Sequence, residues 1–329
     1  MERFLIIRTS SLGDIVHTLP ALAALRKRRP GAEIRWVVES KGRAILEWVS
    51  GLDKIIVKGR PGWRKAMRRK DQTALDFQGL LKSGLVAFLS RSGRRVGFHR
   101  LNLKEPLAGI FYTDRAPIFP ETDHVIRKNC HLLSVLGIET LEIDFALTVP
   151  ETEREAIRST LRDTCAWDGR RRIALFNVGA AWPTKRWPAE RWSEVIQALA
   201  QDAIFPLLLW GTDEEREIAS AVNFRTGTPL VPFLTLPQTL ALIRESALLV
   251  SGDTFALQAA GALDVPVVGL FGPTNPRRNG PFRERDGVVY HPPACGPCYK
   301  RACRPLDCMK AVTAPEVIPH VRRLLDAHD

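Results

Sequence analysis

Short apolar runs and helix-spaced apolar positions alternate along the first half of the chain. Phe4–Ile7 is a continuous apolar run typical of a buried parallel strand, and after a polar turn apolar positions recur with helical spacing at Ile15, Leu19, Leu22 and Leu25. This alternation is the pattern of a parallel sheet in an α/β protein. It predicts further strands at 33–39, 54–57, 73–77 and 96–98, and helices at 43–49, 80–89 and 124–136.

The same pattern restarts in the second half. Pro150 and the charged run 151–172 mark a transition, after which strands are predicted at 173–177, 204–210, 247–250 and 265–271, with helices between them. Two similar sheets predict an α/β protein of two Rossmann-like lobes with a central cleft. We expect an N-terminal domain at 1–150, a C-terminal domain at 151–312, and a final segment at 313–329 whose helix packs back across the lobes.

The loop after the first strand is the first candidate site. In open α/β sheets ligands bind at the carboxyl ends of the strands, where this chain has Thr9, Ser10, Ser11, Gly13 and Asp14. Two roles fit the Asp14 carboxylate equally well. It caps the N–H groups of the following helix, or it acts on a bound substrate as a base.

A second candidate site begins where the predicted strand 247–250 ends. Small and polar residues at 251–254 open a helix, and the N–H groups of a helix N-terminus suit a phosphate. A carboxylate at this position would repel phosphate, so we expect Asp253 to cap the helix and Thr254 to contact the phosphate. A plain strand-to-helix turn is the alternative.

Two more strand ends of the same predicted sheet carry small and ionic residues. After 173–177, a glycine and alanines let a ligand approach the backbone, and Lys185 is placed to offset charge on a departing phosphate. After 204–210, Glu214 is suited to accept hydrogen bonds from ribose hydroxyls, although an exposed glutamate at a helix start is the commoner interpretation. Three such strand ends favour a nucleotide ligand.

Charge narrows the choice of partner. The 329-residue chain has 48 Lys and Arg against 36 Asp and Glu, and its net charge of +12 favours partners that carry phosphates or carboxylates. Seven cations lie in the segment Lys58–Lys70, which is either a solvated face or a loop that closes over an anionic acceptor. Lys82 follows the next strand, within reach of the same place. Nucleic acid is disfavoured because Trp63 is the only aromatic residue in this run.

The cellular compartment expected for the chain affects how its cysteines are interpreted. No segment approaches the roughly 20 unbroken apolar residues of a membrane span, and the first strand is too short for a signal peptide, so we expect a cytoplasmic protein. In a reducing compartment a metal loop or a reduced structural loop is favoured over disulfides. The spacing C-x2-C-x4-C-x4-C would let four thiolates hold a structural zinc or iron, with Cys295, Cys298, Cys303 and Cys308 as ligands.

These motifs together resemble the ADP-heptose:lipopolysaccharide heptosyltransferases of glycosyltransferase family 9. The resemblance covers nearly the whole chain and is strongest in Arg8-Thr-Ser-Ser-Leu-Gly-Asp-Ile, Asp76-Phe-Gln-Gly-Leu-Leu-Lys-Ser and Lys185-Arg-Trp-Pro. The N-terminal motifs look most like the heptosyltransferase I branch, which adds the first heptose to the Kdo sugar of the inner core. The other segments that carry the resemblance are 36–39, 105–108, 111–112, 252–254 and 270–274.

The resemblance implies a GT-B fold, with the acceptor on the N-terminal lobe and the sugar nucleotide on the C-terminal lobe. It also implies inversion without a catalytic metal or other required cofactor, Asp14 as general base and Lys185 as the lysine that binds the diphosphate. It implies an anionic lipid A–Kdo acceptor at the inner membrane, a peripheral location there, and Lys82 as an acceptor-binding lysine. Taken with the first strand end and the basic run, we expect acceptor contacts from Ser10, Ser11, Gly13, Arg60, Arg64, Lys65, Gln78, Lys82 and Lys104. The ADP-heptose donor is expected at Gly179, Ala180, Thr184, Lys185, Gly211, Glu214, Leu234, Asp253, Thr254, Phe255 and Gln258.

Two residues depart from the family pattern. Phe255 and Gln258 stand where the family usually has Gly and His after Asp-Thr. Phenylalanine narrows a phosphate pocket at the helix start, and glutamine carries neither a titratable proton nor a positive charge. These departures leave open a family 9 enzyme that uses another sugar nucleotide, or another glycan or a protein as acceptor. A nicotinamide dehydrogenase is disfavoured because no G-x-G-x-x-G follows the first strand.

Overall fold

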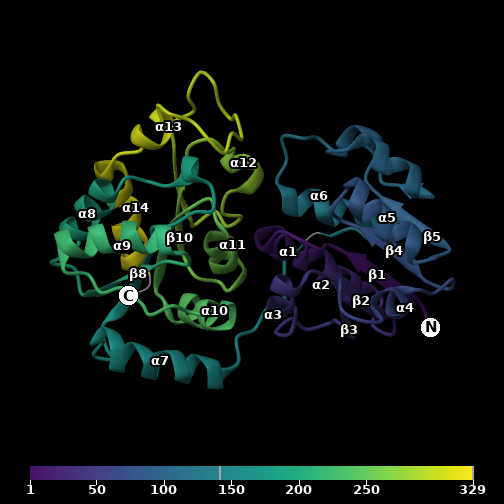
Figure 1. Ribbon diagram of the computed structural model, residues 1–329, viewed down its shortest axis with the longest axis horizontal. Helices are drawn as coiled ribbons and strands as arrows, with labels where there is room; N and C mark the ends of the chain where they lie inside the picture. Colours follow the sequence, from purple (N-terminus) through teal and green to yellow (C-terminus); the bar gives the residue numbers. More distant parts are fainter. Residues whose placement is uncertain (141, 328–329) are drawn as a thin grey trace. The chain divides into compact units, whose positions relative to one another are not determined.

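The computed structural model describes residues 1–140 and 142–327, and it divides into two compact units. Unit 1 is Met1–Thr148 and unit 2 is Val149–Asp329, whereas the sequence boundary was placed at 150. Each unit contains one parallel sheet with helices packed on it, which confirms the α/β class with two Rossmann-like sheets (Figure 1). Residue 141 and the last two residues of the predicted segment 313–329 lie outside the described residues.

The sheet of unit 1 has the order β3-β2-β1-β4-β5-β6, with every neighbouring pair parallel. Residues 4–7 of β1 are buried because this apolar run has no polar side to present to water. The short strand β6 was not predicted, since two charged or polar residues carry no apolar pattern. The strands are β1 (Arg3–Ile7), β2 (Glu33–Val38), β3 (Lys54–Val57), β4 (Thr73–Asp76), β5 (Arg94–Gly97) and β6 (Asp114–Arg115).

The helix predicted after β1 is divided in two. Pro20 lies in the first turn of the second helix, where a missing N–H costs no hydrogen bond, and this residue sets the break. The predicted helix 124–136 likewise ends as an α-helix at Leu132 and continues as a 3₁₀ turn, η4 (Leu133–Leu136). The helices of unit 1 are α1 (Leu12–Val16), α2 (Leu19–Arg28), α3 (Arg43–Leu46), α4 (Trp63–Met67), α5 (Leu81–Leu89) and α6 (Val125–Leu132), with 3₁₀ turns η1 (Ser40–Gly42), η2 (Arg100–Asn102) and η3 (Pro106–Phe111).

The sheet of unit 2 has the order β11-β10-β9-β7-β8 and is also parallel throughout. The strand order reverses between β7 and β9, as it does between β1 and β4 in unit 1. Such reversals are the points where α/β sheets bind ligands. The strands are β7 (Arg172–Asn177), β8 (Ile204–Leu209), β9 (Leu248–Gly252), β10 (Val267–Phe271) and β11 (Gly287–Tyr290), the last of which was not predicted.

The charged run between the sheets is itself a helix, α7 (Glu151–Cys165). Ile157, Leu161 and Cys165 recur every four residues and are buried, while Arg154 and Arg158 pair with Glu245 of the neighbouring helix α10 (Leu236–Glu245). The many charged residues of this segment made its narrow apolar stripe difficult to recognise in the sequence.

The C-terminal helix α14 (Ala314–Asp326) packs against β9, β10, β11 and α8 of its own unit. Its return across the lobes stays a prediction.

None of the helices among the described residues is long and apolar enough to cross a bilayer. The other helices of unit 2 are α8 (Ala189–Ala198), α9 (Asp213–Thr226), α11 (Phe255–Ala262), α12 (Pro276–Asn279) and α13 (Asp307–Lys310), with a 3₁₀ turn η5 (Pro183–Lys185).

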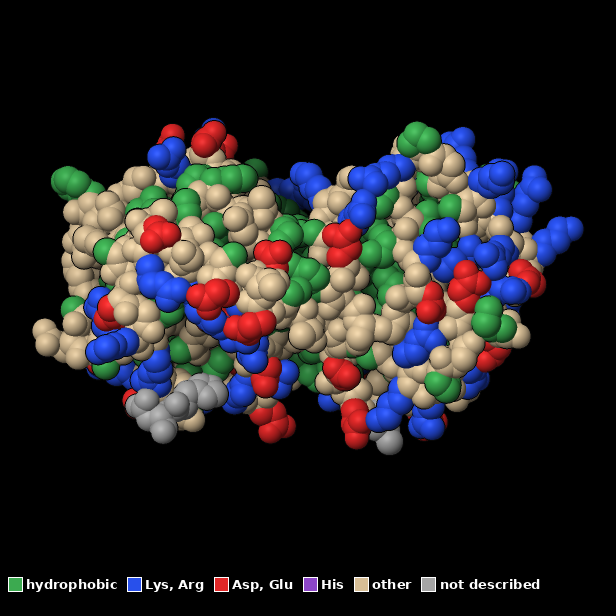
Figure 2. All heavy atoms as spheres, turned by 90° about the horizontal axis from the view of Figure 1, so that it is seen from below, with side chains coloured by type: hydrophobic (Ala, Val, Ile, Leu, Met, Phe, Trp, Pro, Cys, Tyr) green, Lys and Arg blue, Asp and Glu red, His purple; other side chains and the backbone are tan. Residues whose placement is uncertain are grey.

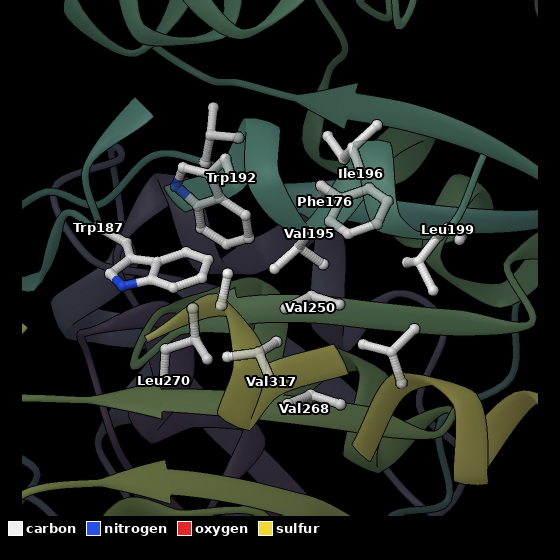
Figure 3. Packing of buried hydrophobic residues seen from close by; sticks show 14 of the residues in the cluster. Phe176, Trp187, Trp192, Val195, Ile196, Leu199, Val250, Val268, Leu270 and Val317 are labelled. Carbon is white, nitrogen blue, oxygen red and sulfur yellow. The ribbon is translucent and has the colours of Figure 1, made fainter. Parts of the chain in front are cut away.

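Aromatic packing anchors the core of unit 2 (Figure 3). Trp192 of α8 meets Trp187 edge-to-face at 5.0 Å between ring centroids, and it meets Phe176 of β7 at 6.3 Å. The Trp187 indole donates to the carbonyl of Val312 at 2.9 Å, whereas the Trp192 indole N–H is buried without a hydrogen-bond partner. Edge-to-face pairs of this kind add to the free energy gained by burial.

Truncating this anchor should destabilise unit 2 strongly. We expect Trp192→Ala to lower the free energy of unfolding by about 3–5 kcal/mol, because it leaves a large cavity between α8 and the sheet. Trp192→Phe keeps most of the apolar volume and removes the unpartnered N–H, so it should cost roughly half of that or less. Urea denaturation followed by circular dichroism measures both, and equal losses for the two variants would contradict this account.

Candidate functional site: polar clusters at the two strand-order reversals

An ion pair lies where β1 ends in unit 1. Arg8 Nη2 is 2.6 Å from Asp14 Oδ1, and the Ser11 hydroxyl and backbone N–H donate to Asp14 Oδ2 at 2.8 and 3.1 Å. The Arg8 side chain is 8% exposed and also donates to the carbonyl of Phe77 at 2.6 Å, whereas Asp14 is 38% exposed. Asp14 is thus part of a capping box with Ser11, and a buried arginine holds its other oxygen.

These contacts keep Asp14 ionised. Partial desolvation of the carboxylate would raise its pKa, but the positive charge of Arg8, the charge of His17 and the hydrogen bonds from Ser11 outweigh that effect and lower the pKa to about 2. At neutral pH the group is an anion that accepts hydrogen bonds. Arg8 was not singled out from the sequence, although an arginine directly after an apolar strand is a recognisable signal.

Neighbouring residues join β1 to β4 across the reversal. The backbone N–H and hydroxyl of Thr9 donate to Gln78 Oε1 at 3.0 and 2.8 Å. Asp76 is buried next to them; it accepts from the Tyr112 hydroxyl at 2.8 Å, and burial raises its pKa. Of the predicted acceptor residues, this places Ser10, Ser11, Gly13 and Gln78 in one region with Asp14.

The predicted basic acceptor residues are distributed more widely in unit 1. Arg60, Arg64 and Lys65 are exposed and follow β3, two strands away from β1. Figure 2 shows many Lys and Arg side chains on the face of the molecule that it draws. Lys82 in α5 and Lys104 are exposed as well. A hollow of about 660 Å³ lies along the free edge of β3; Arg60 and Trp63 line it, whereas Asp14 is not among its described lining residues.

Three polar side chains meet at the reversal in unit 2. Asn177 Nδ2, at the end of β7, donates to the Ser251 and Thr254 hydroxyls at 2.9 and 3.0 Å, and these hydroxyls are 2.9 Å apart. Thr254 is the N-cap residue of α11 but makes no side-chain cap bond. The start of α11 therefore presents its N–H groups beside a fixed set of hydroxyls, a geometry that suits a phosphate oxygen.

A second ion pair lies next to this cluster. Lys185 Nζ is 2.7 Å from Asp253 Oδ2 and 3.1 Å from the Asp253 carbonyl, and it lies 4.3 Å from the Trp182 ring centroid. Both partners are largely buried, at 14% and 8% side-chain exposure. The expected cap from Asp253 is therefore wrong: its carboxylate pairs with Lys185, and Thr254 is the N-cap. The ion pair is favoured because it keeps two desolvated charges neutralised.

Glu215 rather than Glu214 lies against the backbone of Gly179 and Gly211. Glu214 is 73% exposed and pairs with Arg186 at 2.8 Å, while Glu215 accepts from the Gly211 N–H at 2.8 Å. A Cβ built on Gly179 would lie 2.3 Å from the Glu215 carboxyl carbon, so a larger residue there would displace the Glu215 side chain. The signal for Glu215 was available, since Thr212 and Glu215 have the spacing of a capping box.

The remaining predicted donor residues differ in their surroundings. Thr184 is buried and donates to the carbonyl of Lys300 at 2.7 Å, and Leu234 is buried. Phe255 is partly exposed at the start of α11, and Gln258, one turn later, donates to the carbonyl of Asn279 at 2.7 Å. Ala180 accepts from Arg186 at 2.9 Å. Ala180 and Thr184 follow β7 in the chain and Phe255 and Gln258 follow β9, and their contacts assign no ligand.

The four cysteines of the C-terminal loop are free thiols in the structure. Burial raises the pKa of Cys308, and the nearby charges of Cys298 and Cys303 add to that effect. Within residues 1–140 and 142–327, no group of three or more His, Cys, Asp or Glu side chains is arranged to hold a metal ion. A structural zinc or iron at this loop therefore stays a prediction.

The two sheets and their polar reversal points define the class of protein. The fold is that of GT-B glycosyltransferases: the solved structure "E. coli heptosyltransferase WaaC with ADP" matches with a TM-score of 0.76 and 25% identity over 98% of this chain and 99% of that one. A family 9 glycosyltransferase structure from Veillonella parvula matches with a TM-score of 0.84 at 22% identity, covering 99% and 97% of the two chains.

Sequence comparison identifies the family. Residues 62–308 match glycosyltransferase family 9 (heptosyltransferase), so the chain belongs to this family and is a glycosyltransferase. Lipopolysaccharide heptosyltransferase 1 of Pseudomonas aeruginosa is 30% identical over 92% of this chain and 87% of its own length. The enzyme of the same name from Escherichia coli K12 is 29% identical over 88% and 94% of the two chains.

Removing the guanidinium of Arg8 should change the titration of Asp14. We expect Arg8→Met to raise the Asp14 pKa from about 2 toward its ordinary value of 3.8 or above, because desolvation would then act with less opposition. In the parent protein, ionised Asp14 stabilises the fold above about pH 4, and this contribution disappears as the pH falls through 2. A carboxyl-carbon NMR titration measures the pKa. Arg28→Met, at an exposed position of α2, is the control, and an unchanged Asp14 pKa in Arg8→Met would contradict the assignment.

Proposed function

We propose that this chain transfers heptose from ADP-heptose to the Kdo region of the lipopolysaccharide inner core, with inversion at the anomeric carbon and without a catalytic metal. The observation that carries the proposal is the match, over 92% of this chain, to an enzyme named lipopolysaccharide heptosyltransferase 1. The E. coli WaaC structure with ADP supports the choice of donor nucleotide. The polar clusters at both strand-order reversals supply groups suited to this chemistry.

The donor binds in unit 2 under this proposal. The hydroxyls of Ser251 and Thr254 and the N-terminus of α11 bind the diphosphate. The Lys185 ammonium is 2.7 Å from Asp253 in the structure, and under this proposal it also interacts with the diphosphate. The Glu215 side chain lies against Gly179 and is fixed by its capping box with Thr212. This glutamate replaces Glu214 as our candidate for the ribose hydroxyls.

The acceptor reacts at Asp14 under this proposal. The acceptor hydroxyl attacks the anomeric carbon of heptose while its proton passes to the Asp14 carboxylate; the bond from that carbon to the diphosphate breaks, and ADP leaves with the electron pair. Lys185 and the α11 N-terminus stabilise the charge that grows on the leaving group. Attack opposite to the leaving group inverts the centre. Because these protein cations carry the electrostatic role, the proposed reaction requires no catalytic metal.

The acceptor is a membrane lipid in this proposal, so the protein works at the cytoplasmic face of the inner membrane. The high positive charge of the chain favours such an anionic acceptor. Phe255 and Gln258 depart from the family pattern. The alternative proposal is therefore a family 9 enzyme that uses another sugar nucleotide as donor, or a different glycan or a protein as acceptor.

A direct assay tests substrate, stereochemistry and metal dependence together. The purified chain, incubated with ADP-heptose and de-heptosylated lipopolysaccharide, should release ADP and form a product whose new linkage has the opposite anomeric configuration to the donor. Activity should be unchanged by EDTA, because protein cations stabilise the leaving group. ADP-glucose and GDP-mannose serve as donor controls. Loss of activity in EDTA that is restored by a divalent cation would refute the metal-independent mechanism, and preference for a control donor would change the donor.

The role of Asp14 requires its own test. We expect Asp14→Asn to lower kcat about 10²–10⁴-fold, since an amide cannot take the acceptor proton, while ADP still stabilises the folded protein against heat. In the parent enzyme the acidic limb of kcat/KM that reports Asp14 should lie below pH 4, because its pKa is lowered to about 2. Asp123→Asn, at an exposed position in unit 1, is the control. Near-normal turnover of Asp14→Asn would remove this residue from the mechanism.

A further inference from the structure

Unit 1 carries an exposed apolar surface formed by two segments that pack against each other. Leu81, Leu85 and Phe88 lie on one side of α5, and Leu107 and Ile110 project from η3; each is between 40% and 72% exposed. We call these five residues the α5–η3 surface. On the other side of α5, Ser83, Gly84, Val86 and Ala87 are buried. The helix is therefore apolar on both sides, and among the described residues the side with Ser83, Gly84, Val86 and Ala87 is the buried one.

The two segments form one continuous surface. The rings of Phe88 and Phe111 are 6.0 Å apart between centroids, and a Cβ built on Gly84 would lie 2.7 Å from the Phe111 ring. Glu105, just before η3, accepts from the backbone N–H of Leu81 at 2.7 Å. A contiguous apolar surface of this kind on a folded protein indicates an interaction site, whereas single exposed apolar residues do not.

Positive charge surrounds this surface. Between residues 81 and 118 the chain has seven Lys or Arg and only two acidic residues, Glu105 and Asp114, a local net charge of +5. Both acids are engaged, Glu105 with the Leu81 N–H and Asp114 with Arg94 at 3.0 Å. Arg95 lies over the Phe88 ring at 5.9 Å and donates to the carbonyl of Phe111 at 2.7 Å. The other cations are Lys82, Arg91, Arg100, Lys104 and Arg115, all exposed.

The mixture of residues favours a bilayer over a protein partner. Lys82 directly follows the exposed Leu81 and lies three residues before the exposed Leu85, and lysine is depleted from the cores of protein interfaces because its charge would have to be desolvated. At a bilayer surface the apolar side chains enter the acyl boundary while long cationic side chains reach the anionic headgroups. A protein partner would need a surface complementary in shape to these aliphatic and phenyl side chains, whereas the acyl region of a bilayer adapts to them.

We propose that the α5–η3 surface docks unit 1 on an anionic phospholipid bilayer. The inference rests on the proposed function for its purpose, because a lipid-linked acceptor is reached only at the membrane. Leu81 lies three residues after Gln78, whose side chain bonds Thr9 in the loop that carries Asp14. The same strand end thus leads to both the docking surface and the acceptor loop, so docking brings the base to the headgroup layer.

Vesicle binding by the full chain tests the inference without relying on catalysis. The parent protein should co-sediment with vesicles of phosphatidylcholine and phosphatidylglycerol at a 3:1 ratio, bind pure phosphatidylcholine much more weakly, and lose affinity as salt screens the cations. The double variant Phe88→Ser with Ile110→Ser should lose about tenfold or more in affinity for the anionic vesicles. Phe224→Ser with Val288→Ser, at exposed apolar positions of unit 2, is the matched control and should bind as the parent does.

The outcomes separate this inference from the proposed function. Thermal melting first verifies that each variant is folded, and transfer to a soluble, de-acylated acceptor should be equal in parent and variants. Vesicle binding without heptose transfer would uphold the docking surface and defeat the proposed function. Equal vesicle binding by the parent and the Phe88→Ser, Ile110→Ser variant would overturn the inference. A parent dimer that dissociates in this variant, seen by analytical ultracentrifugation, would also overturn it, by showing that the surface pairs two copies.

Discussion

In each sheet the strand order reverses between one pair of neighbouring strands, and this constraint sets where polar side chains meet at the edge of an otherwise apolar core. The reversal lies between β1 and β4 in unit 1 and between β7 and β9 in unit 2. The connections on either side leave in opposite directions, so the strand ends stay accessible to a ligand. Hydrogen bonds of Thr9 with Gln78, and of Asn177 with Ser251, join the two strands across each reversal. These two strand-order reversals therefore set the positions of the candidate site residues.

Each reversal also carries one carboxylate–cation pair, and the two pairs differ in which partner is accessible. In unit 1 the arginine is buried and Asp14 is the more exposed partner, so the pair presents an ionised carboxylate. In unit 2 both Lys185 and Asp253 are largely buried, and the aromatic ring of Trp182 lies against the ammonium. An anionic ligand that enters beside such a pair competes with its carboxylate for the cation. The proposed reaction uses this difference, with a base on one unit and charge stabilisation on the other.

The segment that follows β4 connects two features of unit 1. Asp76 and Gln78 organise the strand end beside the Asp14 loop, and α5 begins three residues after Gln78 with an apolar outer side. Under the two proposals, this connection relates the position of the Asp14 carboxylate to that of the α5–η3 surface. It depends on the inner side of α5 being packed against the sheet, because the outer side is then presented as a unit.

The sequence by itself determined the α/β class, both parallel sheets and the positions of most strands, because long apolar runs have few alternatives to burial in a sheet covered on both sides. It also identified Asp14, Lys185, Asp253 and Thr254 as candidates, since strand ends are readable from the pattern. It missed the break before α2, although Pro20 was a visible signal, and it missed Glu215, whose capping-box spacing was present. Only the tertiary structure decided how these residues are paired. Lys185 and Asp253 are 68 positions apart, and Thr9 and Gln78 are 69 apart. No local pattern relates such residues, because their contact depends on which strands become neighbours, and that order is set by packing of the whole unit.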